Sequence, residues 1–118
     1  MALDALGDEP FCYLTTIGRR TGSRRTIEIW FAIRTPTVYL LSGDGAGAHW
    51  VRNLLSEPEV EVRIGAASFA GRARVLEGGA EEAAARQLLL EKYQPTYAGD
   101  LTGWSRTSLP VAVDLRIP

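Results

Sequence analysis

The chain has 118 residues, 46% of them hydrophobic and 23% charged, and its formal net charge of −1 at pH 7 argues against general nucleic-acid binding. This length predicts one globular domain over residues 1–118, and the single cysteine, Cys12, excludes an intramolecular disulfide or a cysteine-based metal site. No apolar run approaches the roughly 20 residues that span a bilayer, and the first residues show no signal-peptide pattern, so we expect a cytoplasmic protein without stable membrane insertion.

The first part of the chain is typical of antiparallel strands. Aromatic and β-branched residues predict a strand over residues 11–17. Residues 25–33 alternate in polarity and predict a second strand, and residues 37–42 predict a third. A short turn containing Pro36 separates the last two segments, so we expect them to pair as a hairpin.

The second part of the chain alternates helices and strands. A short helix begins near His49 and is stopped by Pro58. Residues 59–65 and 66–76 then predict two paired strands. Residues 79–93 predict one long helix, whose acidic first turn and basic last turn suit the helix dipole.

The remaining segments complete a small domain. Residues 94–108 are rich in turn formers and predict a loop, and residues 109–117 predict the last strand. Six strands linked mostly as hairpins, together with two helices, indicate a β-rich α+β domain whose strands form a small antiparallel barrel.

The turn "TTIGRRTGSRR" concentrates positive charge in an otherwise near-neutral chain. Gly18 and Gly22 permit a tight turn, and the guanidinium groups beside them are suited to phosphate or carboxylate. The four arginines are Arg19, Arg20, Arg24 and Arg25. The residues alone leave two interpretations open, an anion-binding site and a solvated surface turn.

A glycine-rich loop, "SGDGAGAHW", lies between the third strand and the short helix. Such a loop can bring backbone N–H groups and a helix N-terminus to an anion or a flat ring, although it also suits a flexible hairpin end. Its spacing is not a dinucleotide fingerprint, because the helix is too short for a parallel crossover. On that helix Trp50 and Asn53 share a face, where Asn53 either contacts a ligand or ties down a neighbouring loop.

Aromatic residues and one histidine are the other candidates. Trp30 lies on the polar face of its strand, where an aromatic side chain is either part of a second small core or a wall for a planar ligand. His49 is the only histidine, so a metal site is improbable. The sequence shows no nucleophile or acid–base motif, so any chemistry would depend on a bound organic cofactor.

The joint occurrence of "TTIGRRTGSRR" and "WVRNLLSEPEVEVRIG", in this order, resembles the deazaflavin-dependent nitroreductase family, also described as coenzyme F420-dependent quinone reductases. The resemblance extends from about residue 14 to residue 115. It implies a split β-barrel of the flavin-reductase type and a soluble enzyme that transfers hydride from reduced coenzyme F420 to a small-molecule acceptor. The acceptor would be a quinone, a nitro compound or another activated unsaturated molecule.

The same resemblance implies roles for individual residues. It puts Arg20 and Arg25 at the positions that hold the anionic cofactor tail, with Arg19 and Arg24 as supplementary contacts. Ser42 and Gly43 fall where the backbone approaches the deazaflavin ring, and Trp50 and Asn53 match the helix beside the cofactor pocket. The substrate pocket candidates are Trp30, Tyr93 and Tyr97, with Trp104 in the same aromatic segment and the acid Glu28 near the groove.

Three points stay open at this stage. Arg25 and Trp30 have opposite parity along their strand, so both reach one groove only if Arg25 lies in the turn or a bulge intervenes. The same barrel is also compatible with FMN as the cofactor, or with a cofactor-binding or haem-binding module without turnover, in which His49 is the only histidine available to ligate iron. A homodimer is also compatible with the sequence.

Overall fold

The computed structural model describes residues 3–117. In chain order, its strands are β1 (Cys12–Ile17), β2 (Arg24–Ile29), β3 (Ala32–Arg34), β4 (Thr37–Ser42), β5 (Glu59–Ile64), β6 (Ala67–Val75) and β7 (Leu109–Leu115). Its α-helices are α1 (His49–Ser56), α2 (Gly79–Tyr93) and α3 (Thr102–Thr107), and its 3-10 helices are η1 (Leu3–Asp8), η2 (Gly45–Gly47) and η3 (Gln94–Thr96). The one long predicted helix, residues 79–93, is confirmed at both ends.

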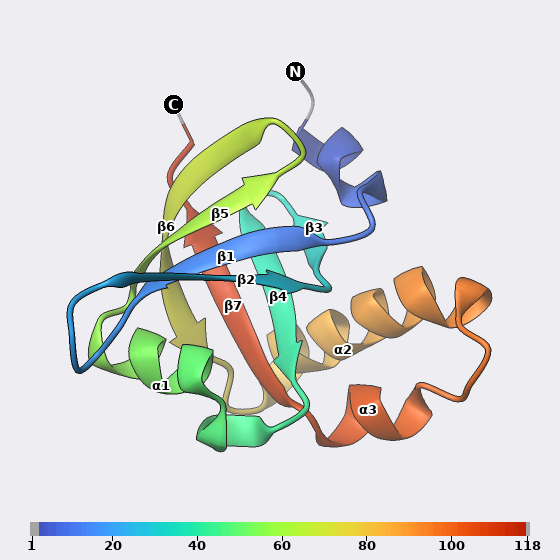
Figure 1. Ribbon diagram of the computed structural model, residues 1–118. Helices are drawn as coiled ribbons and strands as arrows, with labels where there is room; N and C mark the ends of the chain where they lie inside the picture. Colours follow the sequence, from blue (N-terminus) through green and yellow to red (C-terminus); the bar gives the residue numbers. More distant parts are fainter. Residues whose placement is uncertain (1–2, 118) are drawn as a thin grey trace.

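The strands form one antiparallel sheet in the order β2-β1-β5-β6-β7-β4-β3. Figure 1 shows that the sheet is strongly curled, with α1 beneath one end and α2 and α3 at the other. The two edge strands, β2 and β3, follow one another in the chain with only Trp30 and Phe31 between them. The sheet must therefore curl until its two edges approach each other, which agrees with the predicted barrel.

The prediction of six strands was wrong, because the segment 25–33 is two strands. Cys12 pairs with Ile29 at the end of β2, whereas Ala32 at the start of β3 pairs with Tyr39. Between them, the backbone N–H and carbonyl of Phe31 bind side chains of α2 instead of a neighbouring strand. The predicted hairpin around Pro36 is confirmed. Of the segment 25–33, only β3 takes part in it, by pairing with β4.

The break in the segment is held by Tyr93 and Lys92. The Phe31 N–H donates to the Tyr93 hydroxyl oxygen at 3.0 Å. Lys92 Nζ donates to the Phe31 carbonyl at 2.9 Å, and the Tyr93 hydroxyl lies 2.8 Å from the Pro10 carbonyl, to which it donates. These partners come from residues far along the chain, so the local alternation of residues 25–33 could not reveal the break.

The prediction of two α-helices was also wrong, since part of the predicted loop 94–108 forms α3. Its sequence, TGWSRT, has low intrinsic helix propensity. Tertiary contacts compensate: Leu101 and Ser105 are buried, and Arg86 Nη1 donates to the carbonyls of Ser105 and Ser108, both at 2.9 Å. The guanidinium thus satisfies carbonyl groups that a helix end leaves without partners.

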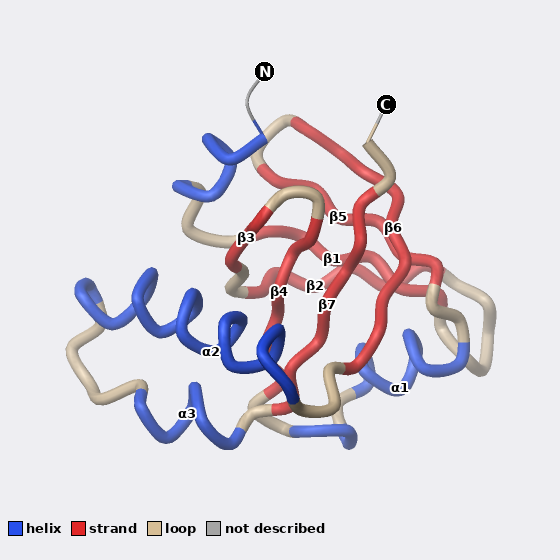
Figure 2. Tube along the Cα trace, turned by 180° about the vertical axis from the view of Figure 1, so that it is seen from behind, coloured by secondary structure: helices blue, strands red, loops and turns tan. Residues whose placement is uncertain are grey.

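Two hydrophobic clusters fill the domain. The first lies inside the curled sheet and includes alternate residues of β5 and β7, namely Val60, Val62, Ile64, Val111, Val113 and Leu115. The second lies between the sheet and α2, whose Ala85, Leu89 and Tyr93 form one buried stripe. Figure 2 shows α2 lying along the strands β4 and β7, with α3 beside α2.

An ion-pair network fastens α2 to the sheet. Arg74 on β6 donates to both carboxylate oxygens of Glu81 at 2.7 Å and to Asp114 of β7 at 2.7 Å. The Tyr39 hydroxyl donates to Glu81 at 2.8 Å, and the Thr37 hydroxyl donates to Asp114 at 2.9 Å. The first turn of α2 is therefore tied to three adjacent strands.

Candidate functional site

The arginine-rich turn between β1 and β2 is closed by its own backbone. The Gly18 N–H donates to the Ser23 carbonyl at 2.7 Å, and the Gly22 N–H donates to the Gly18 carbonyl at 2.8 Å. Gly22 has φ of 72°, a left-handed conformation that glycine adopts without steric cost. The turn is consequently an ordered loop that can hold its arginines in fixed places.

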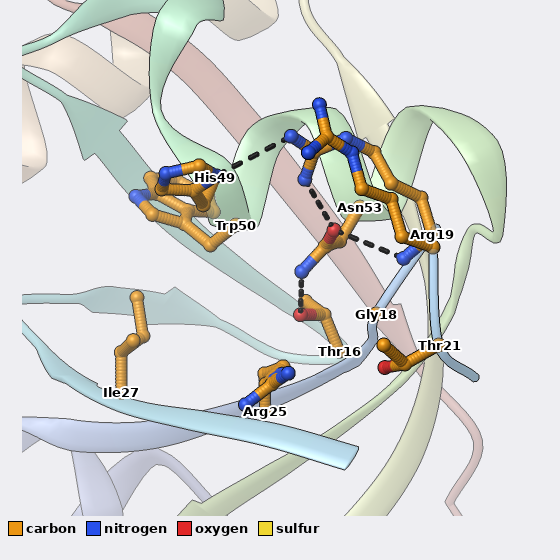
Figure 3. Close-up of a pocket in the computed structure, with 10 residues that line it drawn as sticks. Thr16, Gly18, Arg19, Thr21, Arg25, Ile27, His49, Trp50 and Asn53 are labelled. Carbon is orange, nitrogen blue, oxygen red and sulfur yellow. Dashed lines mark hydrogen bonds between the residues drawn. The ribbon is translucent and has the colours of Figure 1, made fainter. Parts of the chain in front are cut away.

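A hollow of about 420 Å³ lies between this turn, β2 and α1, and we call it the arginine hollow (Figure 3). The turn and β1 contribute Thr16, Gly18, Arg19, Arg20 and Thr21, β2 contributes Arg25 and Ile27, and α1 contributes His49, Trp50 and Asn53. The structure thus brings together five predicted cofactor-binding side chains and the glycine turn. Ile27, Thr16 and His49 also line it, although the sequence did not single them out for this site.

Arg20 and Arg25 are the cations of the arginine hollow that are free to bind an anion. Both are exposed, and within residues 3–117 neither forms an ion pair with a carboxylate. A guanidinium presents its donors as a planar fork that matches carboxylate and phosphate. The apolar surfaces of Ile27 and Trp50 bound the same hollow, so it can take a ligand that combines anionic and apolar parts.

Arg19 is used differently from its neighbours. Its backbone N–H and its Nη1 both donate to Asn53 Oδ1, at 3.3 and 2.8 Å, and its Nη2 lies 3.3 Å from His49 Nδ1. The Asn53 amide in turn donates from Nδ2 to the Thr16 hydroxyl at 3.2 Å. Asn53 is buried in α1, with 4% of its surface exposed. Its hydrogen bonds to Arg19 therefore connect the arginine turn to α1.

Arg24 lies outside the arginine hollow. Its guanidinium pairs with Glu61 of β5 at 3.3 Å, on the opposite face of the sheet, where Thr26 also bonds to Thr15. Alternation along β2 accounts for this, because successive side chains of a strand point to opposite faces. Arg25 and Arg24 are therefore neighbours in the chain with different surroundings.

A second hollow, of about 260 Å³, lies at the other end of β2, and we call it the tryptophan hollow. It is lined by Glu28, Ile29, Trp30, Leu41 and Trp104. Arg25 sits within β2 and faces the arginine hollow, whereas Trp30 follows the strand and faces this second one. The opposite parity of Arg25 and Trp30 therefore needs no bulge, because the two side chains line different hollows.

Trp30 is the centre of an aromatic cluster. Its ring stacks on Tyr93, with ring centroids 4.2 Å apart and an interplanar angle of 6°. Trp104 and Tyr97 contact it edge to face, with centroid distances of 5.5 and 5.8 Å. Trp104 comes from α3, so the helix that the sequence did not predict supplies one wall of the tryptophan hollow.

The two tyrosines near Trp30 differ in their freedom. The hydroxyl of Tyr93 is engaged with the Phe31 and Pro10 backbones, and burial raises the pKa of Tyr93 to about 12. Tyr93 therefore supports Trp30 from behind, and it is unsuited to releasing a proton near neutral pH. Tyr97 is 49% exposed and leaves its hydroxyl open to solvent.

Ser42 ends β4 and Gly43 follows it; neither lines the arginine hollow, and Gly43 lies near Trp104 of the tryptophan hollow. Ser42 is buried, and its hydroxyl donates to the Gly45 carbonyl at 2.8 Å, which closes the glycine-rich loop. A Cβ on Gly43 would lie 3.9 Å from Trp104, so this loop packs close to the indole. The carboxylate of Glu28, expected near the groove, accepts a hydrogen bond from Tyr13 at 3.4 Å.

Two further kinds of site are not found among residues 3–117. No group of three histidine, cysteine or acidic residues is placed to hold a metal ion. Within the same part of the chain, no helix is long and apolar enough to cross a membrane.

Comparisons with known proteins agree with this fold. A family model described as F420H(2)-dependent quinone reductase matches residues 4–116. None of the curated proteins matches the chain in sequence. A solved F420-H2 dependent reductase, FDR-A, is 27% identical to the chain, with 88% of this chain and 93% of that chain covered and a TM-score of 0.72.

Two other solved structures are similar. One, described as a domain-swapped dimer, is 27% identical over 88% of this chain and 79% of its own, with a TM-score of 0.72. The haem storage protein HutZ from Vibrio cholerae is 15% identical over 96% of this chain and 86% of its own, with a TM-score of 0.73, and is similar in fold alone. Together with FDR-A, these likenesses confirm the predicted split-barrel fold.

Proposed function

Since the chain belongs to the F420H(2)-dependent quinone reductase family, we propose that it transfers hydride from reduced coenzyme F420 to a small-molecule acceptor. The acceptor class is a quinone, a nitro compound or another activated unsaturated molecule. The single observation that carries the proposal is the arginine hollow, in which two arginines that form no ion pair within residues 3–117 face the apolar surfaces of Ile27 and Trp50.

Arg20 and Arg25 would hold the anionic tail of the coenzyme. They are exposed and form no ion pair with a carboxylate within residues 3–117, so no internal partner has to be displaced. Ile27 and Trp50 would contact its less polar part. Because FMN has one phosphate and no glutamate tail, two free arginines favour the deazaflavin over FMN.

The chain's own residues would bind and orient the coenzyme and the acceptor and would exclude water, while the bound deazaflavin supplies the hydride. The tryptophan hollow adjoins the arginine hollow along β2 and offers indole surfaces to a planar acceptor. Holding two reactants in fixed relative positions is a large part of the catalytic effect for such a transfer. Because the Tyr93 hydroxyl is engaged, the proton would come from solvent or from the exposed Tyr97.

A homodimer is part of the proposal. The related structure described as a domain-swapped dimer is 27% identical to this chain and supports it. Sedimentation of the purified protein should show a species of twice the monomer mass. A single monomeric species at all concentrations would reject this part and leave the proposed chemistry untouched.

The test is a set of titrations with coenzyme F420, FMN and haem, followed by tryptophan fluorescence. Trp50 lines the arginine hollow, so a ligand bound there should change its emission. We expect saturable binding of coenzyme F420, and oxidation of the reduced coenzyme when menadione or a nitroaromatic compound is added. Tight binding of FMN or haem without binding of the deazaflavin would contradict the proposal.

A further inference from the structure

We propose that His49 is a ligand-binding residue of the arginine hollow, held by Arg19 as a neutral imidazole that donates from Nε2 to an oxygen of the bound coenzyme. The proposal rests on the proposed function for the identity of the ligand. It also assigns Arg19 a positioning role, in place of the supplementary tail contact that the sequence suggested. The arrangement of the two residues is shown in Figure 3.

The tautomer of His49 follows from its partner. A guanidinium carries only donors, and Arg19 Nη2 lies 3.3 Å from His49 Nδ1. Nδ1 must then act as the acceptor, which places the proton of a neutral imidazole on Nε2. An imidazolium would carry a proton on both nitrogens and could not accept this bond.

Arg19 is itself fixed, so it can fix the histidine. Its Nη1 donates to Asn53 Oδ1 at 2.8 Å, and the buried amide of Asn53 is anchored to Thr16. One chain of hydrogen bonds thus runs from Thr16 in β1 through Asn53 and Arg19 to the exposed ring of His49. Groups that are held in this way bind ligands with a smaller loss of conformational entropy.

His49 shares the arginine hollow with several cations. Arg20 of the turn and Arg52 of α1 act electrostatically on Arg19, and Arg25 of β2 lines the same hollow. Within residues 3–117, His49 Nε2 has no hydrogen-bond partner, because the only hydrogen bond of the ring is at Nδ1. An oxygen acceptor such as a carbonyl, hydroxyl or phosphate group of the coenzyme is the partner that this nitrogen can take.

The tautomer can be measured without any ligand, because His49 is the only histidine in the chain. In ¹⁵N-labelled protein near pH 8, the imidazole nitrogen shifts should report the Nε2–H form. Arg19→Met should change them to those of a tautomer mixture, whereas Arg20→Met is the matched control and should leave them unchanged. A wild-type spectrum of the Nδ1–H form, or an unchanged spectrum in a folded Arg19→Met variant, would overturn the proposal.

The ligand role is tested with two variants, each of which replaces one of the two imidazole nitrogens by a side-chain amide group. His49→Gln places an amide donor near the position of Nε2, and His49→Asn places an amide oxygen near Nδ1 without a donor further out. We expect the affinity of His49→Gln for coenzyme F420 to be within about 2-fold of wild type. The affinity of His49→Asn should be about 5- to 10-fold weaker, which is the usual contribution of one neutral hydrogen bond. Equal affinity in both variants and wild type would overturn the ligand role.

The two readouts separate this inference from the proposed function. Failure of the wild-type protein to bind coenzyme F420 would reject the proposed function and the ligand role of His49 together. The Nε2–H tautomer and its dependence on Arg19 would still be decided by the spectra. Normal coenzyme binding in every His49 variant would reject only this inference.

Discussion

Arg19 and Asn53 form one hydrogen-bonded unit, in which both the backbone N–H and the guanidinium of Arg19 donate to the side-chain oxygen of Asn53, at 3.3 and 2.8 Å. The unit joins a surface turn to a buried position of α1. It orders the turn while leaving the next arginine, Arg20, exposed in the arginine hollow. Arg19 therefore orders the turn, whereas Arg20 stays available to bind an anion.

The role of Asn53 predicts a stability effect. Asn53→Leu removes the acceptor of Arg19 and leaves the buried Thr16 hydroxyl without its donor. We expect the free energy of unfolding to fall by about 1–3 kcal/mol, the usual cost of unpaired buried polar groups. Urea denaturation measures it.

Thr16→Val is the matched partner for that variant. Adding it to Asn53→Leu removes the stranded hydroxyl, so part of the lost stability should return. Additive losses in the double variant would show that the Thr16 bond to Asn53 contributes nothing.

Neighbouring arginines should differ in coenzyme binding. Arg25→Ala removes a cation that lines the arginine hollow, whereas Arg24→Ala removes one that pairs with Glu61 on the other face. We expect Arg25→Ala to weaken coenzyme F420 binding by about 10- to 100-fold, as expected for a charge-assisted hydrogen bond. Arg24→Ala should leave the dissociation constant nearly unchanged, and fluorescence titration of both variants provides the check.

Salt provides a second readout for the same pair. The affinity of wild type and of Arg24→Ala should decrease as ionic strength rises, because exposed charges are screened. The decrease should be smaller in Arg25→Ala. Equal affinities for the two variants would place the anion elsewhere.

Tyr93 is predicted to be structural. Tyr93→Phe keeps the ring that stacks on Trp30 but removes the hydroxyl that joins the Phe31 and Pro10 backbones. We expect a loss of about 1–3 kcal/mol of stability, since buried backbone groups lose their partner. Tyr97→Phe, at a half-exposed position, should unfold at nearly the wild-type denaturant concentration. A stability loss in Tyr97→Phe as large as in Tyr93→Phe would argue against this assignment.

The Arg74 network predicts a pH dependence of stability. Hydrogen bonds from Arg74 lower the pKa of Glu81 from its ordinary 4.5 to about 2, and they also lower the pKa of Asp114. Because the folded protein holds these carboxylates ionised more strongly than the unfolded chain, the stabilisation is fully present above about pH 4.5. It is lost as the pH falls toward 2.

Glu81→Gln tests that dependence. The stability difference between wild type and variant, from urea unfolding at a series of pH values, should be largest above pH 4.5 and shrink toward pH 2. The Arg74 and Glu81 side chains are 42% and 35% exposed, so solvent screening keeps the difference below what the shift alone implies. A difference independent of pH would show that the network is not electrostatic in origin.

Much of the fold followed from local patterns. The alternation of Val60, Val62 and Ile64, and the acidic start of the helix 79–93, depend on residues close together in the chain, and the structure has these elements as expected. The arginine turn and the face shared by Trp50 and Asn53 were visible for the same reason. Local sequence determines where strands and helices form when no distant contact competes.

The tertiary structure alone decided the rest. The end of β2 before Trp30 depends on Tyr93 and Lys92, which lie more than 60 positions further along the chain. Likewise, α3 forms from weak helix formers because Arg86 binds its last carbonyls, and it brings Trp104 to the tryptophan hollow. The sequence also could not show that Arg25 faces the arginine hollow while Arg24 does not. This depends on the orientation of β2 in the curled sheet and on the free energy of long-range contacts.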